Sequence, residues 1–191
     1  MPDEQLTKGI VLHAMRLAVL DVWGEAGIAQ VASRVSADTR VQTVAASASP
    51  LAWVPERFLV EWHEAVWEGP ADHDDAALCR VIHRRIDFGF GRVRKALLGL
   101  VGPEGVVRRA GELWKHDHTH GVFVVNIAND GRSVSGTLSD HVFCESPVAR
   151  RALAETFRYI VQLSRGVKAA RETHGLQGAS LSIRVTWSDV T

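Results

Sequence analysis

The sequence predicts an α+β fold in which a helical N-terminal lobe is followed by a small antiparallel sheet with a packed helix. Three observations carry this prediction. Apolar residues recur at three- and four-residue spacings over 9–23, as on the buried face of a helix. The run 122–127 is short and rich in β-branched residues, as in a strand. The segment 179–187 alternates apolar and polar residues, which is the period of a strand with one buried face.

Glycines and prolines divide the first half of the lobe. Gly24 ends the first helix, and a second short helix follows over 26–35. The small residues of 45–50 predict a loop or a crossing on the surface. Pro55 stands where the first residue of a helix would be, so we expect the next helix to run from there to about Glu68.

Two further helices complete the lobe. Aspartates at 72, 74 and 75 predict the cap and the acidic first turn of a helix that reaches about residue 87. The glycines of 88–91 predict a break or a kink, after which 92–101 resumes the helix. Pro103 and Glu104 begin a last helix, which ends near His116.

The rest of the chain predicts the sheet. Asn129-Asp130-Gly131 is typical of a turn and joins the strand at 122–127 to a second strand over 133–143. Ser146-Pro147 opens a helix, and a turn at 175–178 leads into the last strand. We therefore expect a single domain, with the helical lobe over about 5–116 and the sheet-containing core over about 117–191.

Composition excludes several classes of function. A chain of 191 residues with 46% hydrophobic content can bury roughly two thirds of its unfolded surface. We therefore expect its folding to need no metal ion or disulfide. Its 22 basic residues balance 22 acidic ones, so we expect no nucleic-acid partner and no binding to an anionic membrane. Cys79 and Cys144 match no metal-binding or redox spacing and predict free thiols. The polar N-terminus and the lack of a long apolar run predict a soluble cytoplasmic protein.

Short motifs carry a resemblance to a known fold. Lys8-Gly9-Ile10-Val11, followed by Val22-Trp23-Gly24, resembles the opening of the heme-nitric-oxide/oxygen-binding (H-NOX) domains. The later order of helix, hairpin, helix and two strands is similar to the core that H-NOX domains share with vinyl-reductase-type ligand-binding domains and TRAPP-complex subunits. Trp53-Val54-Pro55-Glu56 and the final Val185-Thr186-Trp187 resemble a bacterial paralogous family of similar length.

The sequence departs from H-NOX where that family binds heme. A helix histidine ligates the iron in H-NOX domains, and the resemblance places Arg94 at that position. A guanidinium is permanently protonated and cannot act as an iron ligand. The Tyr-x-Ser-x-Arg motif that holds the heme propionates is missing too, because the only tyrosine, Tyr159, precedes Ile160 and Val161. His83, on the preceding helix, is a remaining candidate iron ligand, and we expect no cofactor.

The resemblance also implies where a ligand would lie. By analogy with the H-NOX pocket, the predicted ligand-binding residues are Val11, Met15, Leu78, Arg94 and Leu98. From the residues alone, Trp53 and Trp67 flank the helix that begins at Pro55 and are candidates to line a pocket or a partner surface.

The most distinctive cluster of possible metal ligands is the run His116-Asp117-His118-Thr119-His120. If this run is extended, alternation places His116, His118 and His120 on one face within reach of one ion. Imidazole nitrogens suit zinc, copper or nickel. The run also stands between a predicted helix and a predicted strand, where histidines are typical of a solvated connection, and we favour that interpretation over the metal site.

These observations favour a regulatory or sensor-type protein without heme, which binds a small ligand or docks a protein partner through its helical lobe. The alternative is a TRAPP-like structural subunit that self-associates as a dimer and has a filled core. A buried cavity between the first helix and 92–101 would favour the first, and a continuous exposed apolar patch the second. The acidic segments 61–64 and 72–75 lack a converging nucleophile, base and oxyanion donors, so we expect no enzyme.

Overall fold

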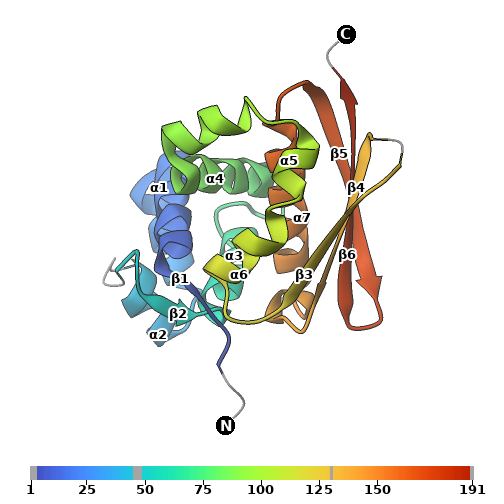
Figure 1. Ribbon diagram of the computed structural model, residues 1–191. Coiled ribbons are helices and arrows are strands. Elements are labelled where there is room, and N and C mark those ends of the chain that lie inside the picture. Colours follow the sequence, from blue (N-terminus) through green and yellow to red (C-terminus); the bar gives the residue numbers. More distant parts are fainter. Residues whose placement is uncertain (1–3, 45–48, 130, 190–191) are drawn as a thin grey trace. The chain divides into compact units, whose positions relative to one another are not determined.

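The structure is a computed structural model that describes residues 4–44, 49–129 and 131–189. The chain divides into two compact units, Met1–Gly89 and Phe90–Thr191, and each is described by itself (Figure 1). The predicted surface crossing at 45–50 lies largely outside the described residues. Helices and antiparallel strands occur in the predicted order, so the α+β fold class is confirmed.

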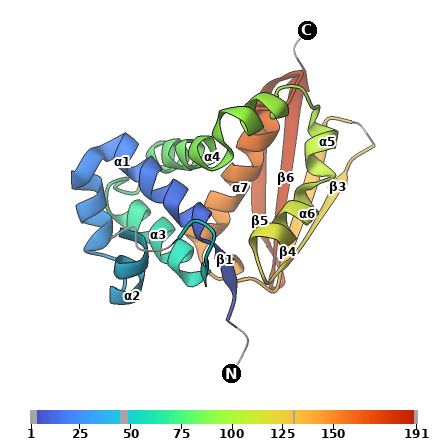
Figure 2. The ribbon, with the colours of Figure 1, turned by 60° about the vertical axis from the view of Figure 1, so that its left-hand side comes forward.

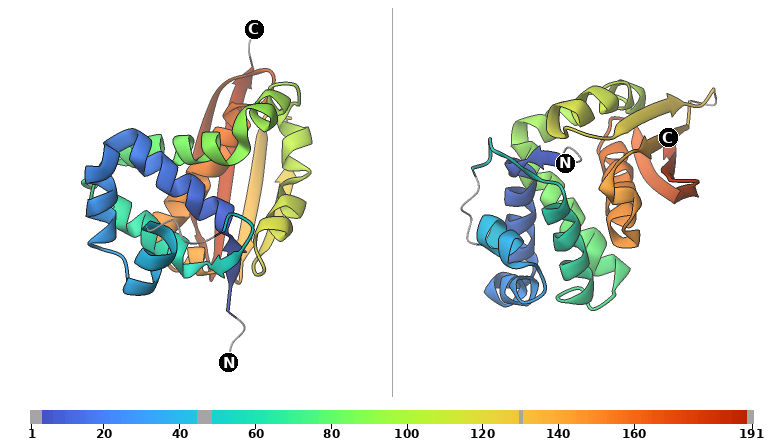
Figure 3. Two further views of the ribbon diagram at one scale, coloured as in Figure 1. Left: turned by 90° about the vertical axis from the view of Figure 1, so that its left-hand side faces the viewer. Right: turned by 90° about the horizontal axis from the view of Figure 1, so that it is seen from below.

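The first unit is mainly helical. Helices α1 and α3 contact each other within it and lie side by side in the right-hand view of Figure 3. Its elements are β1 (Leu6–Lys8), α1 (Gly9–Ala32), α2 (Ala37–Thr39), the π-helical turn η1 (Arg40–Val44), β2 (Trp53–Pro55), α3 (Arg57–Glu68) and the first part of α4 (Asp75–Leu98).

Gly24 changes the direction of α1, as the sequence predicts. Its φ of 66° and ψ of −162° are not helical, and the positive φ suits a residue without Cβ. The helix on each side of Gly24 buries its apolar residues in the unit, among them Leu12, Met15 and Val31, which are 0–1% exposed. The two predicted helices are therefore the two halves of α1.

The prediction that Pro55 begins a helix is wrong. Pro55 ends strand β2, which pairs antiparallel with β1 so that Leu6 lies opposite Pro55. The N–H of Glu56 donates to the carbonyl of Gln5 at 2.8 Å, which extends the strand pairing by one step. Because the backbone is held in the small sheet up to this point, α3 begins at Arg57.

Of the predicted break or kink at 88–91, the break is wrong, because α4 stays helical through these positions, and the kink stays a prediction. Each glycine in a helix interior costs about 1 kcal/mol relative to alanine, which is small enough for tertiary contacts to outweigh. One such contact is the pair between Arg84 Nε and Asp21 Oδ2 at 2.7 Å, which joins α4 to α1. The Arg84 guanidinium also lies 5.5 Å from the ring centre of Phe88.

The second unit contains a four-stranded antiparallel sheet with strand order β3-β4-β6-β5. The predicted helix from Pro103 to His116 is divided in two near Arg108 and Arg109. Strand β5 runs on to Gln177, so the turn follows it rather than occupying 175–178. The elements are α5 (Pro103–Val107), α6 (Ala110–Asp117), β3 (Val122–Ile127), β4 (Ser133–Ser139), the 3-10 turn η2 (Val142–Cys144), α7 (Pro147–Gln162), β5 (Val167–Gln177) and β6 (Ser180–Asp189).

Alternation along the central strands builds the core of this unit. Leu181, Ile183 and Val185 of β6 are fully buried, whereas the residues between them face outward. Helix α7 packs against β5 and β6, as Figure 2 shows. The Ser146 side chain caps its N-terminus by accepting the N–H of Ala149 at 3.2 Å, which confirms the predicted helix start.

Polar side chains of α7 fasten it to the edge strand β5. Glu155, only 3% exposed, accepts hydrogen bonds from Arg158 at 2.6 Å and from Arg151 at 3.2 Å. Arg151 also pairs with Glu172 of β5 at 3.2 Å. Beyond this network, Gln162 donates to the carbonyl of Lys168 at 3.0 Å and accepts the N–H of Ala170 at 2.7 Å, so its amide engages the backbone of β5.

Both free cysteines are confirmed, Cys79 half-buried and Cys144 buried. No helix in the described part of the chain is both long and apolar enough to span a bilayer.

We expect Glu155→Gln to lower the free energy of unfolding by about 3 kcal/mol, because it leaves the largely buried guanidinium of Arg158 without its carboxylate and Arg151 with Glu172 alone. Urea titration measures the loss. Glu104→Gln is the matched control, since its pair with Arg108 is exposed and should contribute at most about 1 kcal/mol. Equal losses in the two variants would contradict a special role for the buried carboxylate.

Candidate functional site

A surface hollow of about 440 Å³ lies in the first unit beside Trp53. It is formed where the short α2, the turn η1 and the strand β2 meet the start of α3. The Ser36 hydroxyl accepts the N–H of Thr39 at 3.3 Å and so fixes the turn that enters α2. The lining residues are Asp38, Val41, Gln42, Trp53, Val54, Pro55 and Phe58.

The hollow combines aromatic walls with charged groups at its rim. Trp53 is 42% exposed, and the Lys8 ammonium lies 3.8 Å from the centre of its ring. The guanidinium of Arg57 lies 4.6 Å from the ring centre of Phe58 and pairs with Asp38 at 3.4 Å. The sequence identified Trp53 as a candidate lining residue, but the contributions of α2 and η1 have no sequence signal.

A second hollow of about 520 Å³ lies near the change of direction at Gly24. Trp67, the other tryptophan that the sequence singled out, is half-buried and packs edge-on against His73 with ring centres 5.3 Å apart. The residues lining the second hollow are Trp23, Ala26, Gly27, Gln30, Arg34, Glu68, Gly69, Pro70 and Asp72.

The ligand-binding residues predicted by analogy lie in different settings. Met15 and Leu78 are core residues of the first unit, with 0% and 1% exposure, and Val11 is half-buried on α1. Arg94 and Leu98 fall on the helical backbone of α4, but their side chains lie outside the described residues. Ligand binding at these five positions stays a prediction.

The first unit also holds a buried group of ionisable side chains, from the residue before α3, from α3 and from α4, which the sequence analysis did not bring together. Glu56 and His63 are 0% and 1% exposed, and Arg85 is partly buried. Desolvation, helped by the positive charge of Arg85 and opposed by Glu56, lowers the pKa of His63 from 6.5 to about 3. Desolvation likewise lowers the pKa of Arg85 to about 10, against the effect of Glu56. At neutral pH the imidazole is therefore neutral and the guanidinium charged.

The three histidines of the predicted metal-binding run lie in different local structures of the second unit. His116 is helical, has a side chain 74% exposed and pairs with Asp117 at 2.7 Å. His118 follows the helix with extended backbone angles of −132° and 139°. His120 contacts the Thr119 hydroxyl at 2.9 Å. Because α6 continues to Asp117, the alternation behind this prediction begins only at His118.

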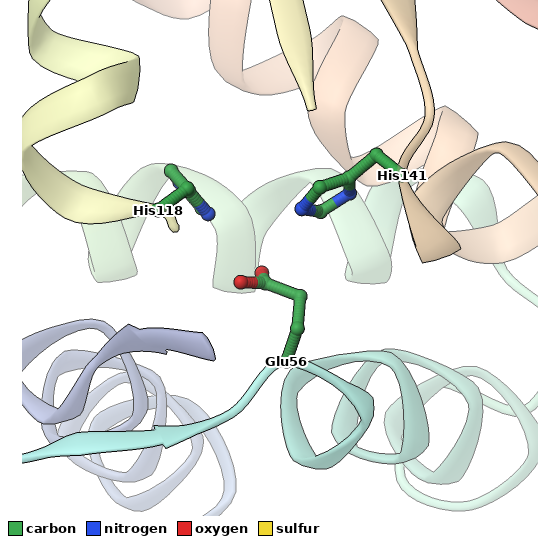
Figure 4. A group of neighbouring side chains, drawn as sticks. All are labelled: Glu56, His118 and His141. Carbon is green, nitrogen blue, oxygen red and sulfur yellow. The ribbon is translucent and has the colours of Figure 1, made fainter. Parts of the chain in front are cut away.

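His118 instead lies beside His141, a residue that the sequence analysis did not select. Their ring centres are 5.6 Å apart and the ring planes are inclined by 81°. Val122 of β3 pairs with Ser139 of β4, so the residues just before β3 and just after β4 meet at the open end of the hairpin. Figure 4 shows the two imidazoles; Glu56, also drawn there, belongs to the first unit.

Trp114 holds this histidine pair in place. Its indole stacks on the His118 ring with centres 3.9 Å apart and planes 10° apart, and its Nε1–H donates to the carbonyl of His120 at 3.0 Å. His141 is 4% exposed and meets the indole edge-on at 4.9 Å. Its Nδ1 accepts the N–H of Phe143 at 3.3 Å, so the proton of the neutral ring sits on Nε2.

No protein-family model and no curated protein sequence matches the chain. Solved structures similar to it include the Fe(II) unliganded H-NOX protein from K. algicida, with a TM-score of 0.63 and 10% identity over 96% of this chain and 97% of that one. An oxygen-binding H-NOX domain related to soluble guanylate cyclases gives 0.64 and 9% over 95% of each chain. A mutant of the T. tengcongensis H-NOX gives 0.64 and 12% over 96% of this chain and all of that one. The predicted H-NOX-like fold is confirmed.

We expect the buried His63 to make the protein sensitive to acid. Its folded pKa of about 3 lies below the ordinary 6.5, so the unfolded chain takes up a proton that the folded one does not. This group is therefore neutral to stability above pH 6.5 and destabilising below it, by about 1.4 kcal/mol for each pH unit from about 6 to about 4. Urea titrations at several pH values should show a shallower decline in His63→Gln. The exposed His116→Gln should keep the slope of the natural chain, and an unchanged slope in His63→Gln would contradict the assignment.

Proposed function

We propose that this chain is a heme-free regulatory protein of the H-NOX-like fold, which binds a small organic ligand in the hollow beside Trp53. The observation that carries the proposal is the hollow itself, whose volume of about 440 Å³ is within the usual range of ligand sites. Trp53, Val54, Pro55 and Phe58 provide apolar contact area, and Asp38 and Gln42 provide polar groups that would orient a ligand.

Two of the similar solved structures concern distortion of heme in H-NOX proteins, so we consider whether heme fits this chain. A porphyrin needs a flat void and a side chain that ligates iron. Among the described side chains of α1 and α4, Met15 and Leu78 are 0–1% exposed, whereas a heme-sized void beside them would leave their surface accessible. His83 is half-buried on α4, and Arg94 stands at the position that the resemblance gives to the ligating histidine. These observations support a heme-free protein.

Docking of a protein partner is the second candidate, and exposed apolar residues around the same hollow favour it. Val41 and Trp53, which line the hollow, are 57% and 42% exposed, and Leu51 is 84% exposed. A partner segment with an apolar side chain would cover this surface. Native mass spectrometry of the chain from its own host separates the candidates, because a small ligand and a protein partner add very different masses.

Absorbance spectroscopy tests the absence of heme. We expect the chain, expressed with added heme precursor and purified, to show no Soret band. A Soret band that disappears in His83→Ala would overturn the heme-free assignment and identify the iron ligand.

Substitution of the indole tests the hollow. We expect Trp53→Ala to lose the small-molecule mass that native mass spectrometry finds on the natural chain, because the hollow loses its largest apolar wall. Phe88→Ala is the matched control, since Phe88 is an equally exposed aromatic residue of the same unit (38% against 42%) outside the lining of this hollow. No bound mass on the natural chain, or equal retention in both variants, would refute the ligand site.

A further inference from the structure

We infer that His118 and His141 together bind one divalent transition-metal ion in the second unit, at the open end of the β3–β4 hairpin. This site is separate from the Trp53 hollow and does not depend on the proposed function. It also differs from the metal site predicted from the sequence, because His116 and His120 are not its ligands.

Distance is the first argument. The potential ligand atoms of His118 and His141 lie within 4.8 Å of each other. A metal–nitrogen bond of about 2.1 Å places two imidazole nitrogens about 3.4 Å apart on a tetrahedral ion and about 4.2 Å apart when they are opposite each other. Small rotations of the two side chains therefore bring both nitrogens into the coordination sphere of one ion.

Rigidity is the second argument. His118 is held by its stacking on Trp114, and the indole is fixed in turn by its hydrogen bond to the carbonyl of His120. His141 packs edge-on against Phe143, with ring centres 4.7 Å apart. An ion therefore meets two side chains that have already lost most of their rotational freedom, which lowers the entropic cost of binding.

Access and ring orientation are the third argument. His118 is half-buried, so an ion can reach the pair from solvent. The hydrogen bond from the Phe143 N–H to Nδ1 orients the His141 ring and leaves Nε2 as the second possible ligand atom. An ion bound at Nε2 displaces the proton there to Nδ1 and costs the 3.3 Å hydrogen bond. This exchange and the small number of imidazole ligands point to micromolar affinity, with water completing the coordination.

Ligand chemistry gives the expected order of affinity. Two imidazoles without a thiolate favour Cu²⁺ over Ni²⁺ and Zn²⁺, as in the general series for divalent ions at nitrogen sites. Mg²⁺ and Ca²⁺ prefer oxygen ligands and should not bind here.

Calorimetry on the full chain, stripped of metal with a chelator, tests this inference with Cu²⁺, Ni²⁺ and Zn²⁺. We expect one ion per chain, and His118→Gln and His141→Gln should each weaken binding at least about 10- to 100-fold, since even loss of an outer-shell partner has this effect. His116→Gln and His120→Gln are the matched controls from the same run and should retain the affinity. Circular dichroism establishes that each variant is folded, and the half-buried His118 provides the variant least damaging to the core.

Fluorescence provides a second readout. Cu²⁺ bound to His118 should quench the emission of Trp114, and Trp114→Phe should lose this quenching and weaken the binding that calorimetry measures, because phenylalanine lacks the hydrogen bond to the His120 carbonyl that fixes the indole. Absence of uptake at micromolar metal would overturn the inference. It would also be overturned if His116→Gln or His120→Gln lost binding while folded His141→Gln retained it.

Discussion

Val122 pairs with Ser139 at the open end of the β3–β4 hairpin, and this register determines how the second unit is built. A shift of one residue would turn every side chain of β3 to the opposite face of the sheet. Phe123 would then leave its contact with Trp114, whose ring centre is 5.5 Å away. The same register brings His118, which follows α6, close to His141, which precedes η2, so this histidine pair depends on the pairing of the strands.

Charge is distributed differently in the two units. In the second unit, Glu155 neutralises neighbouring arginines and fastens a helix to a strand. In the first unit, His63 stays neutral because its burial and the charge of Arg85 both disfavour a second cation. The buried polar groups of the two units therefore differ in charge state and in the elements that they join.

Much of the fold follows from short-range patterns. The strands of the hairpin, the last strand and the helix after Ser146 were predicted because one face of each is apolar and its start or turn residues are distinctive. Pro55 was misplaced because pairing between β1 and β2 is a long-range contact that no local pattern encodes. The helix does not end at Gly89 because helix propensity is a weak preference that packing and the Arg84–Asp21 pair outweigh.

The sites were harder to predict than the fold. Trp53 was selected correctly as a lining residue, but Asp38 reaches the same hollow from α2 and Val41 from the π-helical turn η1. His141 was not predicted as a ligand because no other histidine lies near it in the sequence. His116 and His120 were predicted because alternate residues of an extended run share one face. Extending the predicted hairpin pairing by two residues beyond Val122 would have placed His120 opposite His141 and suggested where to look.

The amide of Gln162 occupies backbone groups of β5 that an added strand would otherwise use. Another chain cannot extend the sheet at Lys168 and Ala170 without first displacing this side chain. On the opposite border, Gly111 of α6 lies so close to Phe123 that a methyl group on the glycine would come within 3.1 Å of the Phe123 carbonyl oxygen. Both outer strands therefore carry a local obstacle to pairing with a further strand. This obstacle matters for β3, because its run 122–127 has no charged residue to oppose such pairing.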